Sequence, residues 1–167
     1  MEKYKVAPQT LPKKLHWFKY EAYFTWLTGF LLLTIVYYLN AKSFMVDPAV
    51  KDISADTAVV IGLSSLLAGW LIYDTLCRTT LLKHPKWFGL VGFIIVTLIA
   101  WILSHYLSGR AVFMHIGALL GTIMAANVFF IIIPSQKALV SAAKRNAPLD
   151  PTLGKLAGLR SLHNNYI

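Results

Sequence analysis

The chain has 167 residues, of which 57% are hydrophobic, and its mean hydropathy is +0.59. Only 14% of the residues are charged, against about 25% in an ordinary soluble domain, so the composition excludes a typical water-soluble protein. The formal net charge is +9, but the basic residues lie at the ends of apolar runs and form no aromatic–basic pattern typical of nucleic-acid binding. We therefore expect an integral membrane protein that contacts lipid and binds no nucleic acid.

Four strongly apolar runs contain no charged residue other than histidine, at 22–41, 57–73, 87–109 and 111–136. A helix that spans a bilayer needs roughly 20 apolar residues. The runs predict an all-α fold, a polytopic membrane bundle within 22–136 with four transmembrane helices at about 22–41, 57–77, 87–107 and 111–133. We expect Pro134 to end the fourth helix, because proline has no N–H to donate.

The basic residues alternate between the two sides of these helices. Segments 1–21, 74–86 and 137–167 carry 13 of the 16 Lys and Arg residues, and the other two connections carry 3. The positive-inside rule then places both termini in the cytoplasm. Residues 1–21 form a basic and aromatic cytoplasmic segment, and residues 137–167 form a cytoplasmic tail that could begin a further helix.

The absence of characteristic motifs excludes several kinds of segment and site. Segment 1–21 has no apolar core before a cleavage site, so it is not a signal peptide. The single cysteine, Cys77, excludes a disulfide, a zinc cluster and a C-x-x-C-H haem attachment within the chain. No phosphate-binding glycine loop, G-x-S-x-G or H-E-x-x-H motif occurs, and we predict no metal site.

Small residues recur at helical spacing and predict close helix packing. Gly117, Gly121 and Ala125 lie four apart, and Ser65 and Gly69 repeat the spacing. Small side chains let membrane helices approach closely. We expect packing within the chain, and the alternative is a helix-mediated oligomer through Gly117 and Gly121.

Polar residues at membrane depth are the functional candidates, because polar groups in lipid are costly unless they have partners. They are His16 and Glu21 near the first helix, Asp74, His105, His115 and Asn127. Each has a structural alternative. His105 could be interfacial, His115 a packed histidine and Asn127 a contact between helices. Asp74 could pair with Arg78, and Glu21 could be a solvated acid in a first helical turn.

Four stretches carry a family resemblance: LHWFKYEAYFTWLTGF (15–30), GWLIYDTLCR (69–78), SGRAVFMHIGALLGTIMAANVFFIIIP (108–134) and RSLHNNY (160–166). They resemble the membrane domain of bacterial membrane-bound urate oxidases. The resemblance implies oxidation of urate to 5-hydroxyisourate in the inner membrane, with cytochrome c as electron acceptor. The chain looks like an internal four-helix piece without the cytochrome c domain, and we expect it to be inactive alone.

The positions that match the family's stretches supply the candidate catalytic residues. These are His16, Glu21, Asp74, Arg110, Asn127 and His163, the last beside Asn164 and Asn165. The implied partner is urate or a related purine; urate is an anion, and Arg110 could pair with it. The cofactor is unknown. A haem held by His115, with His105 as a second ligand, would supply an electron sink near the outer surface.

A different class of function remains open. The helices could form a structural, electron-conducting or transporter-like membrane module with no catalytic site of its own. A Soret band in the absorption spectrum would favour the redox interpretations, whereas a colourless protein that binds urate would favour binding or transport.

Overall fold

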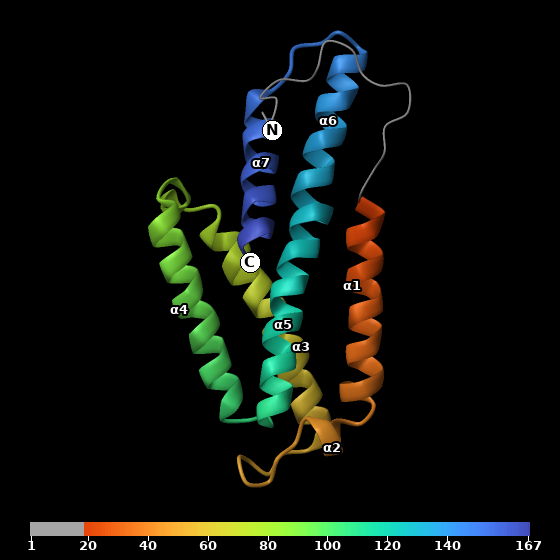
Figure 1. The fold of residues 1–167 in the computed structure, drawn as a ribbon, viewed down its shortest axis with the longest axis vertical. Helices are drawn as coiled ribbons and strands as arrows, with labels where there is room; N and C mark the ends of the chain where they lie inside the picture. The colour runs from red at the N-terminus through yellow and green to blue at the C-terminus, as the bar shows by residue number, and fades with distance from the viewer. Residues whose placement is uncertain (1–18) are drawn as a thin grey trace. The chain divides into compact units, whose positions relative to one another are not determined.

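The computed structural model describes residues 19–167, and all regular elements in this range are helical (Figure 1). In chain order they are α1 (Lys19–Leu33), the π-helix η1 (Thr34–Tyr38), α2 (Ala41–Phe44), α3 (Ala55–Leu76), the 3₁₀ helix η2 (Thr80–Lys83), α4 (Pro85–Ser104), α5 (Gly109–Ala126), the π-helix η3 (Asn127–Ile132), α6 (Ile133–Lys144) and α7 (Pro151–Tyr166). The expected all-α class is confirmed for this part of the chain.

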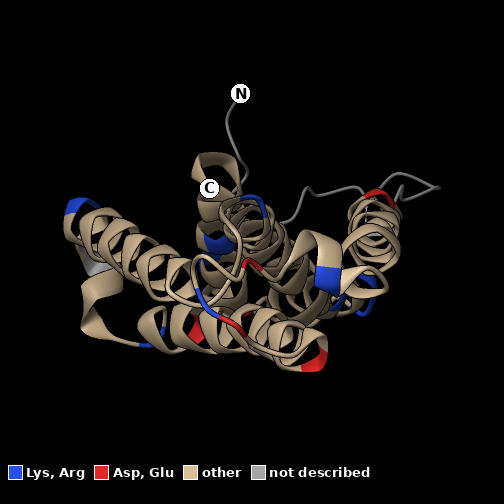
Figure 2. Ribbon diagram, turned by 90° about the horizontal axis from the view of Figure 1, so that it is seen from below, with Lys and Arg blue, Asp and Glu red and all other residues tan. Residues whose placement is uncertain are grey.

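Three helices are long and apolar enough to cross a membrane: Ala55–Leu76, Pro85–Ser104 and Gly109–Lys144. They coincide with the second, third and fourth predicted spans. The first predicted span falls on a 15-residue α-helix that continues as a five-residue π-helix, and it is not among the three. In Figure 2 the helices are mostly tan, the colour of uncharged residues.

The chain divides into two compact units. One comprises Leu27–Ile123, and the other comprises Met1–Trp26 with Met124–Ile167. We call the first the central unit and the second the terminal unit. The core of the central unit includes two clusters of buried apolar side chains, one around Met45 and Leu107 and one around Leu66 and Leu119.

Local sequence signals explain where the helices begin. The Ser54 hydroxyl accepts a hydrogen bond from the Thr57 backbone N–H at the start of α3, and the Asp150 carboxylate does the same for Thr152 in α7. Such caps satisfy backbone donors that have no partner within the helix. Pro85 opens α4 at a position where its missing N–H is not needed.

Pro134 does not end the fourth helix, and this expectation was wrong. The helix runs without interruption from Gly109 to Lys144, over 36 residues. The π-helix η3 lies immediately before the proline, and the Ile133 N–H bonds to the Val128 carbonyl five residues back. A wider turn before Pro134 accommodates the ring and the lost donor, so the helix continues.

The expected packing at Gly117 and Gly121 was also wrong. A Cβ atom at either position would meet no described atom within 4 Å. On α3 a Cβ at Gly69 would collide with Leu119, so the expected close packing is confirmed at Gly69. A Cβ at Gly62 would likewise collide with the His115 ring. The facing helix α5 carries the large side chains of His115 and Leu119 at these contacts, so the small residue of each contact lies on α3.

The terminal unit contains a helical hairpin. Helix α6 ends at Lys144, and Asn146 has a positive φ of 50° in the turn that follows. Helix α7 then runs beside α6 and η3 (Figure 1). Much of the segment 137–167 is therefore ordered helix packed on the end of the long helix, and this packing creates one of the two polar sites described below.

Candidate functional site

Two buried polar clusters stand out in the described chain, one in each unit. The imidazole cluster of the central unit consists of His115, Tyr38 and the Ala111 carbonyl. The amide–guanidinium cluster of the terminal unit consists of Asn127, Arg160, Asn164 and the Met124 carbonyl. Each cluster includes a residue of a π-helix, Tyr38 in η1 and Asn127 in η3, and such helices are frequent at functional sites.

His115 is completely buried, with 0% of its surface exposed. Its Nδ1 atom lies 2.7 Å from the Ala111 carbonyl oxygen. A carbonyl can only accept, so Nδ1 carries the proton and Nε2 is the acceptor of the neutral ring. The Tyr38 hydroxyl lies 3.3 Å from Nε2 and therefore donates to it. Both nitrogens of the imidazole are engaged.

Gly62 makes room for this ring. A Cβ atom at position 62 would collide with Nε2 of His115 and would also approach its Cδ2 at 3.0 Å. Any larger residue at this position would therefore displace the imidazole or separate α3 from α5. The sequence meets this need with a glycine in the middle of an apolar helix, where glycine otherwise weakens the helix.

In the imidazole cluster both nitrogens of His115 have hydrogen-bond partners, so a haem iron at this ring would have to displace the Tyr38 hydroxyl from Nε2. A haem ligand needs a free imidazole nitrogen, whereas the Tyr38 hydroxyl occupies Nε2 and the Ala111 carbonyl occupies Nδ1. His105 is exposed, its Nδ1 lies 2.7 Å from the Trp101 carbonyl, and its ring packs edge-on against Trp101. No group of three or more His, Cys, Asp or Glu side chains within residues 19–167 could hold a metal ion.

The amide–guanidinium cluster contains a buried positive charge. Arg160 is only 3% exposed, and its Nη1 donates to the Asn127 side-chain oxygen at 3.1 Å. The Asn127 amide nitrogen donates to the Asn164 oxygen at 2.8 Å, and the Asn164 nitrogen donates to the Met124 carbonyl at 3.0 Å. The hydrogen bonds thus run in one direction, from the guanidinium to a backbone carbonyl of the long helix.

The helical hairpin positions these side chains. Arg160 and Asn164 are one turn apart on α7, so they lie on the same face of that helix. This face packs against η3, whose first residue is Asn127. Two residues from α7 and one from η3 therefore meet because the chain reverses direction between Lys144 and Pro151.

His163 precedes Asn164 on α7 and is partly buried. Burial lowers the pKa of its imidazole, and the positive charge of Arg160 lowers the pKa further. A lowered pKa keeps the ring neutral at neutral pH, and a neutral imidazole can accept a proton. The terminal unit therefore holds a cation, two amides and a candidate proton acceptor on neighbouring residues.

The other predicted site residues lie elsewhere. Asp74 forms an ion pair with Arg78 at 2.7 Å, as the structural alternative expected. Arg110 is exposed in the central unit, with its Cζ 5.0 Å from the centre of the Phe44 ring. Glu21 is exposed in the first turn of α1 and Asn165 is exposed on α7, while His16 lies outside the described residues.

Sequence reasoning missed two side chains of the clusters and the glycine that makes room for the imidazole cluster. Arg160 was counted only as a positive charge, Tyr38 was interpreted as an interfacial anchor, and Gly62 was not considered. For Arg160 a signal was present, because a basic residue four before Asn164 shares its helical face. For Tyr38 and Gly62 the sequence offers no signal without the arrangement of α1, α3 and α5.

The chain matches no curated protein sequence and no solved structure. It does match a protein-family model described as "Urate oxidase N-terminal", and the match extends over residues 1–167. This finding confirms the relationship to urate oxidases that the sequence stretches indicated. Since the family model covers the entire chain, this protein belongs to the urate oxidase N-terminal family.

Proposed function

We propose that the chain is the membrane-embedded part of an enzyme of the bacterial inner membrane that oxidises urate to 5-hydroxyisourate and passes the electrons to cytochrome c. The observation that carries the proposal is the family match over residues 1–167 in a chain with three helices apolar enough to span a bilayer. In this proposal α1 with η1 supplies a fourth span, and both ends of the chain face the cytoplasm because 13 of 16 basic residues lie on that side.

The chemistry places clear demands on the protein. Urate and one water give 5-hydroxyisourate, two protons and two electrons, and two ferric cytochrome c molecules or domains would accept the electrons. The chain must bind an anion, accept a proton and bring the purine close to the acceptor. The terminal unit has residues suited to the first two tasks, in Arg160 and His163.

Anaerobic reduction of cytochrome c tests the proposed activity. The full-length protein in lipid nanodiscs is mixed with ferric cytochrome c and urate without oxygen. We expect urate-dependent growth of the ferrous absorption band, with two haems reduced per urate consumed. Urate that binds but stays unoxidised would favour a transporter-like module. If the protein neither binds nor oxidises urate, the proposal is contradicted.

Cysteine labelling tests the topology. Single cysteines in loop 42–56 should react with a membrane-impermeant maleimide added to intact spheroplasts, and cysteines in loop 74–86 should react only after lysis. Cys77 is replaced by serine in all variants so that it adds no background. The reverse labelling pattern would overturn the orientation.

A further inference from the structure

We infer that a groove between α3 and α4 binds one acyl chain of a membrane phospholipid and that Lys51 holds the phosphate of the same lipid. The groove lies within the central unit and has a volume of about 560 Å³. This volume is within the roughly 300–1,000 Å³ of ligand sites in proteins. The inference rests on the membrane location proposed above and does not depend on urate as the substrate.

Small side chains on α3 create the groove. Val60, Ser64, Ala68 and Ile72 line it and follow one another at intervals of four residues, so they form one row along the helix. The two residues in the middle of this row are small and exposed. Residues 99–106, at the end of α4 and just beyond it, supply the other wall. The row therefore has bulky side chains at its ends and a hollow between them.

The dimensions of the groove suit a single hydrocarbon chain. Helix α3 rises about 18 Å from Val60 to Ile72, and one leaflet of a bilayer contributes about 15 Å of hydrocarbon. The volume of 560 Å³ over that length corresponds to a mean cross-section of about 30 Å². A helix with its side chains is about 10 Å wide, which gives a cross-section of about 80 Å². The groove is therefore one leaflet deep and too narrow to enclose a helix.

The chemistry of the lining favours a hydrocarbon over a polar ligand. All lining residues except Ser64, Ser65 and Tyr106 have hydrocarbon side chains. The Ser65 hydroxyl donates to the Gly62 carbonyl at 2.7 Å, so its proton is already used within α3. A purine in this groove would leave most of its polar groups without partners, which is costly in an apolar environment. An acyl chain has no polar groups to satisfy.

A positive charge lies at one end of the groove. Tyr106 lines the groove just beyond the end of α4, and the Lys51 Nζ atom lies 4.2 Å from the centre of its ring. The ring attracts the ammonium group and favours this position, and Lys51 is exposed. An ammonium group at the membrane surface attracts a lipid phosphate. An apolar groove that ends at a cation thus matches a phospholipid, with its chain between the helices and its phosphate at Lys51.

Native mass spectrometry tests the inference. The full-length protein is stripped of lipid in detergent and titrated with phosphatidylglycerol. Lys51→Gln should lower the affinity for the first bound lipid about fivefold, the effect of one basic residue near a membrane surface. The matched control is Lys42→Gln, which removes the same charge from an exposed site on α2 in the same connection and should leave the affinity unchanged. Glycerol phosphate, which has no acyl chain, should not compete.

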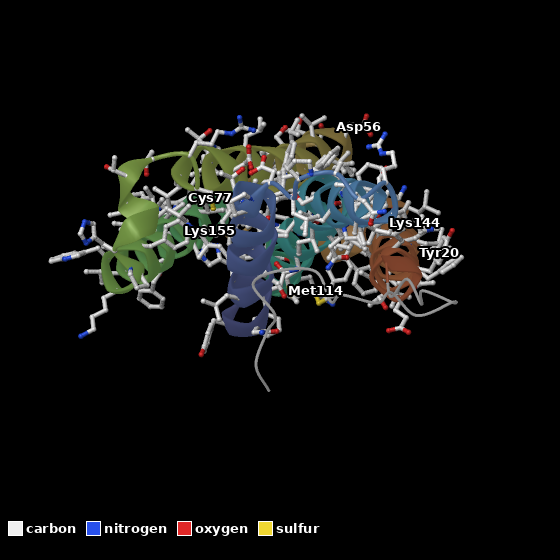
Figure 3. All side chains as sticks on the ribbon, turned by 90° about the horizontal axis from the view of Figure 1, so that it is seen from above. Tyr20, Asp56, Cys77, Met114, Lys144 and Lys155 are labelled. Atoms are coloured by element: carbon white, nitrogen blue, oxygen red, sulfur yellow. The ribbon has the colours of Figure 1, made fainter. Side chains whose placement is uncertain are left out.

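A second variant fills the groove without altering its charge. Ala68→Phe should lower the affinity for phosphatidylglycerol about tenfold, because the lipid chain and the added ring would overlap. The control is Met114→Phe, at an exposed site on α5 that does not line the groove. In Figure 3 Met114 and Asp56, near the start of α3, lie on opposite sides of the central unit. Helical circular dichroism confirms that both variants are folded.

The outcomes separate the inference from its alternatives. Unchanged lipid affinity in Ala68→Phe would overturn it, and an oligomer that dissociates in this variant would show that a second copy occupies the groove. Unchanged affinity in Lys51→Gln, or competition by glycerol phosphate, would overturn the pairing of Lys51 with a lipid that the groove holds. A protein that binds the lipid as described but does not oxidise urate would contradict the proposed function alone.

Discussion

The two polar clusters are built in a similar way but differ in charge. Each takes a residue from a π-helical turn, Tyr38 from η1 and Asn127 from η3, and buries it against a polar group of another helix. The imidazole cluster is neutral, and each ring nitrogen of His115 has one partner. The amide–guanidinium cluster contains a cation. The two clusters are therefore both buried but differ in charge.

The largest effect on stability is expected from Asn127→Leu. It removes the amide that accepts from Arg160 and donates to Asn164. Loss of a buried acceptor for a charged group should reduce the free energy of unfolding by about 3 kcal/mol. Thermal unfolding in detergent micelles measures the effect, with Val128→Leu as the control on the next residue. Equal stability of the two variants would show that the hydrogen bonds of this cluster contribute little.

A smaller loss is expected from Gly62→Ala in the imidazole cluster. The added methyl collides with the His115 ring, and overpacking of this kind costs about 2 kcal/mol. The control is Gly117→Ala, where a Cβ meets no described atom within 4 Å. It should be neutral or slightly stabilising, because alanine favours a helix. If both variants unfold at the same temperature, α3 and α5 do not approach as closely as described.

Tyr38→Phe should reduce stability by about 1 kcal/mol, because it removes the hydroxyl that donates to His115. The variant also tests whether the imidazole cluster takes part in binding urate. If the imidazole cluster serves packing alone, the variant should bind urate with unchanged affinity. A tenfold loss of urate affinity in Tyr38→Phe, with folding retained, would indicate that the substrate binds in the central unit.

The smallest expected effect concerns the pH dependence of His163. Burial and the charge of Arg160 both hold the pKa of this imidazole below its ordinary value. The ring accepts a proton only when neutral, so oxidation should fall as the pH drops through that lowered pKa. Arg160→Gln removes the second cause and should raise the pKa. Imidazole NMR titration measures it, and an unchanged pKa would show that Arg160 does not act on His163.

Most of the fold could be predicted from the sequence. Three of the four apolar runs fall on helices long enough to span a bilayer, because length and hydropathy are local properties. The continuation through Pro134 could not be predicted, since it depends on a π-helical turn that relieves the proline ring. The close approach of α3 to α5 at Gly62 could not be predicted either, because it depends on which helix faces which.

The site could be predicted only in part. Asn127, His163 and Asn164 were candidates from the sequence, and the structure brings Asn127 and Asn164 together with Arg160. Arg110 was favoured as the anion partner because it lies at a position that matches the family and its guanidinium could pair with urate. The burial of Arg160 follows from the hairpin of α6 and α7, which no local pattern indicates.

Anaerobic reduction of cytochrome c with urate or hypoxanthine tests the central claim, urate oxidation, most directly. Both are planar oxopurines, but at pH 7 urate is an anion and hypoxanthine is neutral. The full-length protein should reduce two haems for each urate consumed and should reduce none with hypoxanthine. Equal haem reduction with the two purines, or no reduction with either, would contradict the claim.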